Sequence, residues 1–260
     1  MEIRVLGCHG SQLPGYGFTG FLIDTGMLLD AGTVTSVLTL EEQARIGHIL
    51  ITHAHLDHIR EIASLADNVC QLHRDFPIEV VSTPHVIEML RAHIFNDAIW
   101  PDFSRIPSVE RPVIRFVAIQ AGEKMRLGHL NVTAIPVHHS VETVAYVIET
   151  DEAAPPASAV FVGDTGPTEE IWQVVRQQCG NVGAIFVETS LPEEMTGIAE
   201  LTGHLTPAGL ASELKKLGSL QPPIYLYHMK IQYCREIQRE IALMGNHRIR
   251  VLKDGQVIQI

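Results

Sequence analysis

Cysteine is scarce in this sequence and follows no recognisable pattern. Cys8, Cys70, Cys179 and Cys234 are scattered through 260 residues without a CxxC pair, so they indicate neither a zinc knuckle nor a disulfide framework. No apolar run approaches the roughly 18 residues that a membrane-spanning helix needs. The N-terminus also lacks a basic segment followed by an apolar stretch. We therefore expect a cytoplasmic protein with reduced thiols and no membrane partner.

Positive charge is scarce as well. The chain has 19 Lys and Arg residues against 30 Asp and Glu residues, which gives a net charge of −11. A negative surface field opposes binding to a long nucleic acid. It does not oppose binding of one small phosphate ester at a site that carries metal cations. The 14 histidines are abundant by comparison and hint at such metal binding.

Short strands and helices alternate along the chain without an internal repeat or a linker. Apolar runs predict strands at 3–6, 21–24, 27–30, 48–52, 78–82, 114–119, 124–127, 130–136, 144–150, 159–163, 182–188 and 224–227, with two more at the C-terminus. Capping patterns and periodicity predict helices from residue 39, from residue 83, and at 168–179, 206–217 and 233–244. Two αβ halves that meet near residue 115 predict a single α/β domain over residues 1–260, built around two sheets.

The clearest chemical signal is HAHLDH at residues 53–58. It directly follows an apolar run, and His53, His55, Asp57 and His58 would each need a polar partner in a core. His53 and His55 are two residues apart and can project together from a strand end, whereas Asp57 and His58 come one turn later. Nitrogen and oxygen donors in this arrangement suit two adjacent metal ions. We therefore predict a metal site at this strand end.

Six residues cannot complete two coordination spheres, so further ligands must come from other strand ends. His138 and His139 follow one apolar strand, Asp164 follows another after Gly163, and His228 follows a third. Sites in layered α/β folds gather at the carboxyl ends of strands. These polar residues are therefore the candidates that would complete the metal site.

Taken together, these motifs resemble those of one family. They are HAHLDH, the HHS segment with Tyr146 seven residues after His139, GDT at 163–165, GHLTP at 203–207, YHMK at 227–230 and the upstream Asp30. The set resembles the metallo-β-lactamase superfamily, and in particular its class II cyclic-nucleotide phosphodiesterases. Glu61 departs from the pattern, because that subfamily usually has Gly or Ser soon after HLDH. The resemblance implies a four-layer αββα sandwich of the metallo-β-lactamase type.

The resemblance also implies a ligand set for two divalent metal ions. One ion would take His53, His55 and His139, the other would take Asp57, His58 and His228, and Asp164 would bridge them. Zn²⁺ is the expected metal, with Mn²⁺ and Fe as alternatives. Asp30 would either orient a ligand histidine or stand in a turn before Gly32. We expect no other cofactor.

The implied activity is hydrolysis of 3′,5′-cyclic nucleotides, cAMP or cGMP, to 5′-nucleotides by an activated water. We expect Asp57 and His204 to act in catalysis, with His204 contacting the phosphate or donating a proton. A tRNA 3′-processing endonuclease, a lactonase, a thioesterase and a non-catalytic metal-binding protein are the alternatives. The endonucleases usually carry a long arm between the segments that correspond to His139 and Asp164. Here 24 residues separate the two, which leaves no room for that arm.

Residues 95–112 form a proline-broken segment that contains Phe95, Trp100 and Phe103. These aromatic rings suggest a surface on which a nucleobase could stack. Packing in the core or a homodimer interface explains them equally well, and both alternatives stay open at this point.

Overall fold

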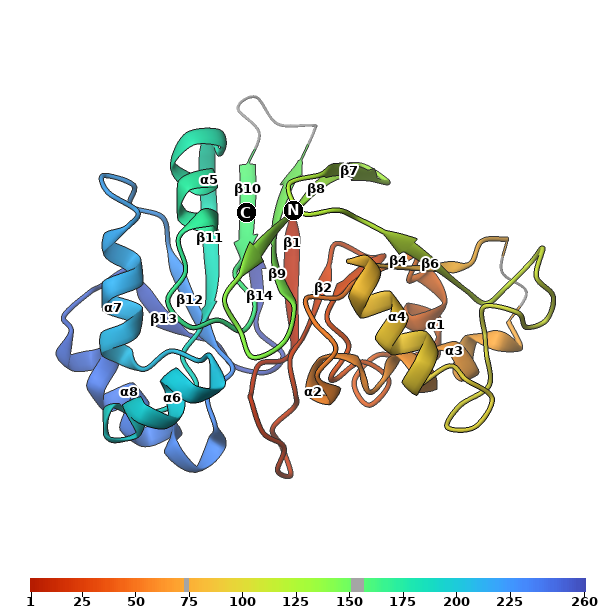
Figure 1. Ribbon diagram of the computed structural model, residues 1–260, viewed down its shortest axis with the longest axis horizontal. Helices are drawn as coiled ribbons and strands as arrows, with labels where there is room; N and C mark the ends of the chain where they lie inside the picture. Colours follow the sequence, from red (N-terminus) through yellow and green to blue (C-terminus); the bar gives the residue numbers. More distant parts are fainter. Residues whose placement is uncertain (73–74, 151–156) are drawn as a thin grey trace. The chain divides into compact units, whose positions relative to one another are not determined.

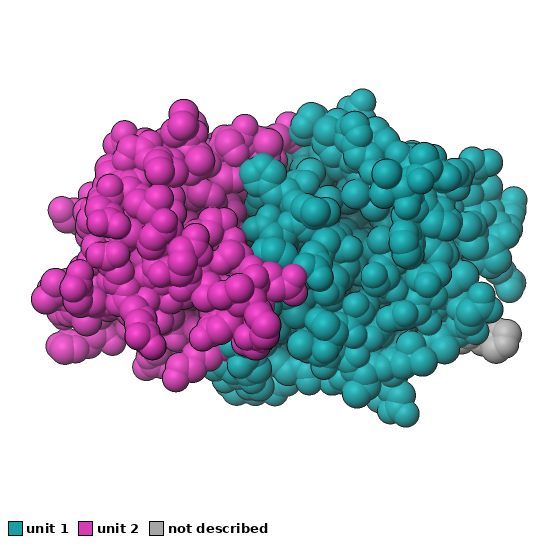
Figure 2. All heavy atoms as spheres, turned by 90° about the horizontal axis from the view of Figure 1, so that it is seen from below, with its two compact units in different colours: residues 1–7, 17–120, 254–259 teal, residues 8–16, 121–253, 260 magenta. Residues whose placement is uncertain are grey.

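The computed structural model describes residues 1–72, 75–150 and 157–260. The chain forms two compact units, shown in different colours in Figure 2. Unit 1 comprises residues 1–7, 17–120 and 254–259, and unit 2 comprises residues 8–16, 121–253 and 260. Among the described residues, no helix combines the length and apolar character needed to cross a membrane.

Unit 1 is built on a seven-stranded sheet in the order β14-β1-β2-β3-β4-β5-β6. Its elements are β1 (Glu2–Gly7), β2 (Gly20–Ile23), β3 (Met27–Leu29), α1 (Leu40–Arg45), β4 (His48–Leu50), α2 (Leu56–Ile59), α3 (Ile62–Cys70), β5 (Ile78–Ser82), α4 (Pro84–His93), β6 (Ile114–Ala118) and β14 (Val257–Gln259) (Figure 1). The pairs from β14 to β3 are antiparallel, and those from β3 to β6 are parallel. Parallel neighbours require crossover connections, and the helices of the unit lie in them.

Unit 2 repeats this plan with the order β13-β12-β11-β10-β9-β8-β7. Its elements are β7 (Lys124–Leu127), β8 (Leu130–Val137), β9 (Thr143–Thr150), β10 (Ala157–Phe161), α5 (Glu170–Gln178), β11 (Asn181–Glu188), η1 (Glu193–Met195), α6 (Thr196–Thr202), α7 (Pro207–Lys215), β12 (Ile224–Tyr227), η2 (Ile231–Tyr233), α8 (Cys234–Leu243) and β13 (Ile249–Val251). Strands β7 to β10 pair antiparallel, and β10 to β13 pair parallel.

Three helices begin where the sequence predicts a cap. The Thr39 hydroxyl accepts from the backbone N–H of Glu42, whose carboxylate accepts from the N–H of Thr39, so the predicted capping box is formed. Thr83 and Thr206 cap α4 and α7 in the same way, each followed by a proline in the first turn. A capping hydroxyl satisfies a backbone donor that the helix leaves unpaired. The predicted starts of these three helices are therefore confirmed.

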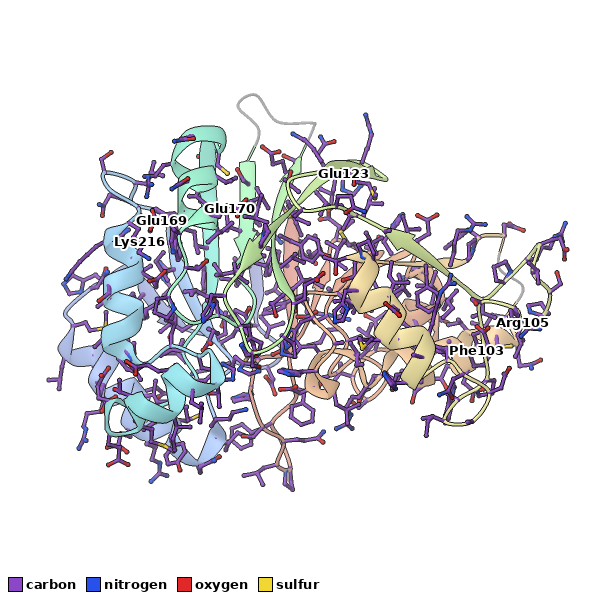
Figure 3. All side chains as sticks on the ribbon, in the orientation of Figure 1. Phe103, Arg105, Glu123, Glu169, Glu170 and Lys216 are labelled. Atoms are coloured by element: carbon purple, nitrogen blue, oxygen red, sulfur yellow. The ribbon has the colours of Figure 1, made fainter. Side chains whose placement is uncertain are left out.

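The aromatic residues of the 95–112 segment belong to the core of unit 1. Phe95 and Phe103 are buried and share a hydrophobic cluster with sheet and helix residues such as Leu65, and Trp100 packs against this cluster. Figure 3 labels Phe103. Phe95 is 2% exposed and Phe103 is 3% exposed, so neither ring offers a face to a ligand. The nucleobase-stacking interpretation is therefore wrong for Phe95 and Phe103, and the packing alternative explains them.

Candidate metal centre

The HAHLDH motif lies in the connection that follows β4 in unit 1. Strand β4 ends at Leu50, two residues earlier than predicted, so the motif sits in a turn and not on the strand. His55 is the N-terminal cap residue of the short helix α2, which places Asp57 and His58 in its first turn. The rings of His53 and His55 lie 4.6 Å apart, and those of His53 and His58 lie 4.2 Å apart. The turn thus gathers three imidazoles and one carboxylate, which we call the unit 1 cluster.

Asp30 orients this cluster from the carboxyl end of β3. One of its carboxylate oxygens lies 2.7 Å from Nδ1 of His58, and both side chains are fully buried. The other oxygen accepts from the backbone N–H of Thr52 at 2.9 Å. Asp30 has a left-handed backbone with φ of 55°, a conformation that Asp tolerates better than most residues. Both sequence interpretations therefore hold, because Asp30 is a turn residue that also fixes a histidine.

Glu61, the departure from the family pattern, has a structural role in unit 1. Its carboxylate accepts from the backbone N–H groups of Val34 and Thr35 at 2.6 and 2.7 Å, and from the Thr35 hydroxyl at 3.1 Å. The residue as a whole is 6% exposed. A carboxylate that satisfies two backbone donors holds the loop that follows Asp30. Glu61 thus supports the cluster from outside it.

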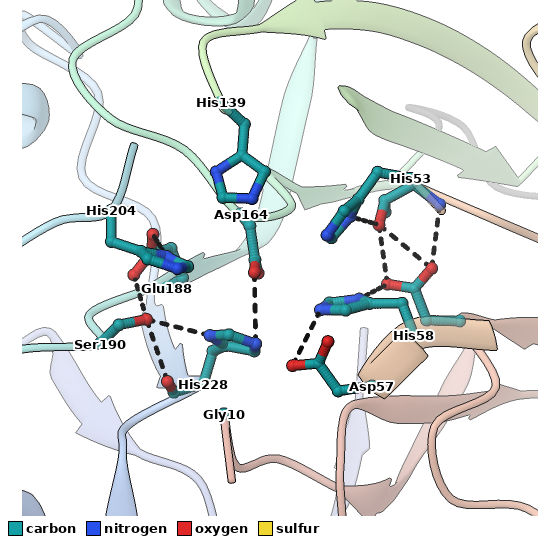
Figure 4. Close-up of polar contacts among 12 residues, drawn as sticks. Gly10, His53, Asp57, His58, His139, Asp164, Glu188, Ser190, His204 and His228 are labelled. Atoms are coloured by element: carbon teal, nitrogen blue, oxygen red, sulfur yellow. Dashed lines mark hydrogen bonds and ion pairs between the residues drawn. The ribbon is translucent and has the colours of Figure 1, made fainter. Parts of the chain in front are cut away.

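Unit 2 gathers a second set of donors at the ends of its strands and in the loop before α7. His139 follows β8, Asp164 follows β10, His204 precedes α7 and His228 follows β12. We call these four residues the unit 2 cluster. One donor atom each from His139, Asp164 and His204 lie within 4.8 Å of one another. Nε2 of His228 lies 3.2 Å from an Asp164 oxygen, drawn as a dashed line in Figure 4.

The GHLTP segment positions both His139 and His204. Gly203 ends α6 with a left-handed φ of 69°, a conformation that favours glycine. Its carbonyl accepts from Nδ1–H of His139 at 2.8 Å, and a Cβ on Gly203 would lie 2.9 Å from the Cα of His139. His204 follows at once, with its ring 5.0 Å from that of His139. The glycine is therefore needed for the close approach of the two histidines.

His228 is held in a strained backbone conformation. Its φ is 65°, which is uncommon for a residue other than glycine. The His228 N–H donates to the carbonyl of Cys8 at 2.7 Å. Gly10 packs against the ring so closely that a Cβ there would lie 2.8 Å from Nδ1 of His228. Strained residues that neighbouring contacts hold in place are concentrated at functional sites.

Glu188 is a buried residue beside His204 that the sequence reasoning missed. It ends β11, is fully buried, and places one carboxylate oxygen 2.8 Å from Nδ1 of His204 (Figure 4). That oxygen also accepts from the backbone N–H groups of Thr165 and Leu205 at 3.2 and 3.3 Å. The sequence did contain a signal for Glu188, which is a single acidic residue at the end of an apolar strand. The same kind of signal identified Asp164.

Glu188 also changes the acid–base behaviour of His204. Burial by itself lowers the pKa of the His204 ring, but the charge of Glu188, its hydrogen bond and the charge of Asp164 act in the opposite direction. The net effect is a His204 pKa above its usual value. A ring of this kind stays protonated to higher pH than an exposed histidine and can donate a proton.

The donors of each cluster fit a divalent metal. Unit 1 brings together His53, His55, Asp57 and His58, and unit 2 brings together His139, Asp164, His204 and His228. Imidazole nitrogen with carboxylate oxygen is a donor set that Zn²⁺, Mn²⁺ and Fe accept. His58 and His139 each engage Nδ1 with a protein oxygen, which leaves Nε2 as the nitrogen for a metal.

Comparisons with known proteins find relatives that are phosphodiesterases. The 3′,5′-cyclic-nucleotide phosphodiesterase 1 of Saccharomyces cerevisiae is 28% identical over 199 residues, which cover 70% of this chain and 53% of that protein. The chain thus spans about half the length of the relatives it matches.

Solved structures show the fold. Unliganded yeast PDE1 superposes with a TM-score of 0.84 at 18% identity, covering 100% of this chain and 99% of that one. The metallo-β-lactamase fold protein YhfI from Bacillus subtilis superposes with a TM-score of 0.76 at 17% identity, covering 99% and 98%. The predicted α/β fold of the metallo-β-lactamase type is therefore confirmed.

The family is shown by a model of the class II cAMP phosphodiesterases, which matches residues 34–230. This segment runs from the loop after Asp30 through the YHMK motif and contains every residue of both clusters. The predicted family resemblance is confirmed: the chain belongs to the class II cAMP phosphodiesterase family.

Proposed function

We propose that the protein is a dinuclear metal-dependent phosphodiesterase that hydrolyses 3′,5′-cyclic nucleotides to 5′-nucleotides. The observation that carries this proposal is the family match over residues 34–230, which includes the whole predicted ligand set. The relatives whose names give this activity support the substrate class. The substrate that follows is small and anionic, in agreement with the net charge of −11, which disfavours a long nucleic acid.

We assign seven residues as the ligands of two divalent ions, four from unit 1 and three from unit 2. They are His53, His55, Asp57, His58, His139, Asp164 and His228. Their nitrogen and oxygen donors favour Zn²⁺, with Mn²⁺ and Fe as the alternatives. When bound, such ions supply Lewis-acid activation of water and stabilisation of charge on the phosphoryl oxygens.

The protein's own residues supply the proton transfers. His204 directs Nδ1–H at Glu188, so a protonated ring presents its second proton on Nε2. We assign this proton to the 3′ oxygen that leaves when the cyclic ester opens. Asp57 is 21% exposed in its side chain and lies 4.0 Å from Nε2 of His58. We assign its carboxylate, in addition to its role as a ligand, as the acceptor of a proton from the attacking water.

Product analysis tests the proposed function. Purified protein supplied with Zn²⁺ or Mn²⁺ should convert cAMP or cGMP to the 5′-monophosphate alone, because the assigned leaving group is the 3′ oxygen. Formation of the 3′-monophosphate would reverse the assignment of the leaving group. Turnover of a lactone or a thioester without any cleavage of cyclic nucleotides would replace the proposed activity with another hydrolase reaction.

A further inference from the structure

Two of the assigned ligand histidines contact a buried hydroxyl through Nδ1. In unit 2, the Ser190 Oγ lies 2.9 Å from Nδ1 of His228. In unit 1, the Thr52 Oγ1 lies 3.0 Å from Nδ1 of His53. All four side chains are at most 1% exposed. Each hydroxyl also contacts a buried carboxylate, so each unit contains a carboxylate, a hydroxyl and an imidazole in series.

The direction of the hydrogen bonds in unit 2 follows from a count of protons. The Ser190 Oγ lies 2.7 Å from a Glu188 oxygen and 3.0 Å from the carbonyl of His228. Both of these groups only accept, and a hydroxyl has one proton to donate. The bond to the carboxylate is the shorter and the stronger one. When that proton is donated to the ionised Glu188 carboxylate, Oγ is the acceptor toward the His228 ring, so Nδ1 of His228 carries a hydrogen.

The same count applies in unit 1. The Thr52 Oγ1 lies 3.1 and 3.0 Å from the two oxygens of Asp30, which only accept when ionised. The hydroxyl proton of Thr52 therefore goes to Asp30, and Oγ1 accepts from Nδ1–H of His53. Each unit therefore has a carboxylate, a hydroxyl and an assigned ligand histidine in the same order, with the same hydrogen-bond directions.

We propose that Ser190 and Thr52 are positioning residues that hold His228 and His53 in the tautomer whose Nε2 lone pair is available to a metal. For His228 this nitrogen is the one that lies 3.2 Å from Asp164. A hydroxyl alone can accept or donate, so it would tolerate either tautomer. The carboxylate behind each hydroxyl removes this ambiguity. The inference rests on the proposed function only in assigning His228 and His53 as metal ligands.

The variants Ser190→Ala and Thr52→Val remove each hydroxyl with little change in shape. Two matched controls carry the same substitutions elsewhere. Ser82 is a buried serine whose hydroxyl donates to the carbonyl of Ile51 at 2.7 Å, and Thr189 is a buried threonine whose hydroxyl donates to the carbonyl of Glu188 at 2.7 Å. Neither of these two bonds involves an imidazole, so Ser82→Ala and Thr189→Val measure the general cost of losing a buried hydroxyl.

The first measurement is ¹⁵N NMR of the histidine rings in metal-free protein at about pH 8, where an ordinary histidine is neutral. His228 and His53 should show a protonated Nδ1 in the wild type and in both controls. Ser190→Ala should increase the Nε2-protonated form of His228, and Thr52→Val should do so for His53. An unchanged tautomer population in both variants would overturn the inference.

The second measurement is affinity for Zn²⁺ alone, by competition with a chromogenic chelator. Loss of a residue that orients a ligand typically weakens metal binding about 10–100-fold, and we expect this range for each variant and less than about threefold for each control. Equal losses in variants and controls would also overturn the inference. Neither measurement uses a substrate, so a failed cyclic-nucleotide assay would contradict the proposed function and leave this inference untouched.

Discussion

The proton-donating role assigned to His204 depends on the residues that its ring contacts. Its Nδ1 is committed to the buried carboxylate of Glu188 at 2.8 Å, and its ring lies 5.0 Å from His139 and 5.5 Å from His228. Because it donates no ligand atom in the assigned set, its removal separates proton transfer from metal binding.

We predict that His204→Ala retains its metal and loses rate according to the leaving group. A nitrophenolate leaves without a proton, so bis-nitrophenyl phosphate should lose little rate. A ribose 3′ oxygen needs a proton, so kcat for cyclic AMP should fall by a factor of about 10² to 10⁴. Steady-state kinetics on both substrates, with metal analysis of the same samples, check this. Equal losses on the two substrates would assign His204 to charge stabilisation, and loss of metal would make it a ligand.

The pKa of His204 provides a second prediction. In metal-free protein, NMR titration of the His204 ring should give a midpoint above the usual value of 6.5. Burial alone would lower that pKa, so Glu188→Gln, which removes the charge and keeps the shape, should bring the midpoint down. A histidine pKa that is higher in the folded state than in the unfolded state increases the free energy of unfolding. This contribution is fully present below the pKa of the unfolded state and is lost as pH rises through the pKa of the folded state. A midpoint unaffected by Glu188→Gln would show that another group sets it.

Sequence reasoning predicted the candidate ligands because they carry their own local signals. His53, His55, Asp57 and His58 stand together in six residues, and His139 belongs to a recognisable segment. Asp30 was also named as a residue that could orient a histidine, but Glu188, Ser190 and Thr52 were missed.

A single Glu, Ser or Thr has no characteristic spacing, and its role depends on partners far away in the chain. Ser190 contacts His228 across 38 positions, and Glu188 contacts His204 across 16. Such pairs become visible only once the fold brings the strand ends together within each unit.

Local sequence patterns predicted the starts of some helices and missed other helices entirely. The caps at Thr39, Thr83 and Thr206 could be predicted because a capping hydroxyl acts within three residues. Helices α2, α3 and α6 were not predicted, and none of them begins with a side-chain cap. Helix α3 nevertheless buries Ile62, Leu65, Ala66 and Val69, so packing of its apolar face stabilises it in place of a cap.

A buried carboxylate joins helices α5 and α7 of unit 2. Glu213 is 2% exposed, accepts from the indole N–H of Trp172 at 2.7 Å, and pairs with Nζ of Lys216 at 2.9 Å. Lys216 also lies 3.5 Å from Glu169, whose side chain is 55% exposed (Figure 3). One lysine thus has a buried and an exposed acidic partner.

We predict that Glu213→Ala lowers the free energy of unfolding by about 3 kcal/mol, because it leaves the buried indole N–H of Trp172 without this acceptor. Glu169→Ala should cost less than about 1 kcal/mol, since water screens the exposed pair. Urea unfolding of the two variants beside the wild type gives both values. Similar small losses would show that water replaces Glu213 at the indole.

At the scale of the whole molecule, the two units repeat one plan. Each sheet has an antiparallel part and a parallel part. The unit 1 cluster lies in the connection after β4, and three of the four residues of the unit 2 cluster follow strands. Sequence patterns predicted two αβ halves meeting near residue 115, and the units change over between residues 120 and 121. The patterns did not predict that residues 8–16 join unit 2 and residues 254–259 join unit 1, because exchanged segments carry no local signal.

Metal content gives the last prediction, because the proposed function assigns ligands to two ions. Protein purified without chelator should contain roughly two transition-metal ions per chain, as the dinuclear assignment requires. A metal that binds only the folded state stabilises it by about 2.7 kcal/mol at a free concentration 100 times its Kd. Removing the metals with a chelator should therefore lower Tm by roughly 5–10 °C, and adding Zn²⁺ back should restore it.

The Asp164→Asn variant sharpens this prediction, because it keeps the shape of the side chain and removes the charge of the assigned bridge. It should lose metal from both positions, show no Tm response to Zn²⁺, and fail to turn over substrate. The matched control is Asp67→Asn, an exposed Asp-to-Asn change on helix α3, which should keep full metal content. If Asp164→Asn retained two ions and a near-normal rate, another carboxylate would have to be the bridge. Asp57 would then be the first carboxylate to substitute in a further test for the bridge.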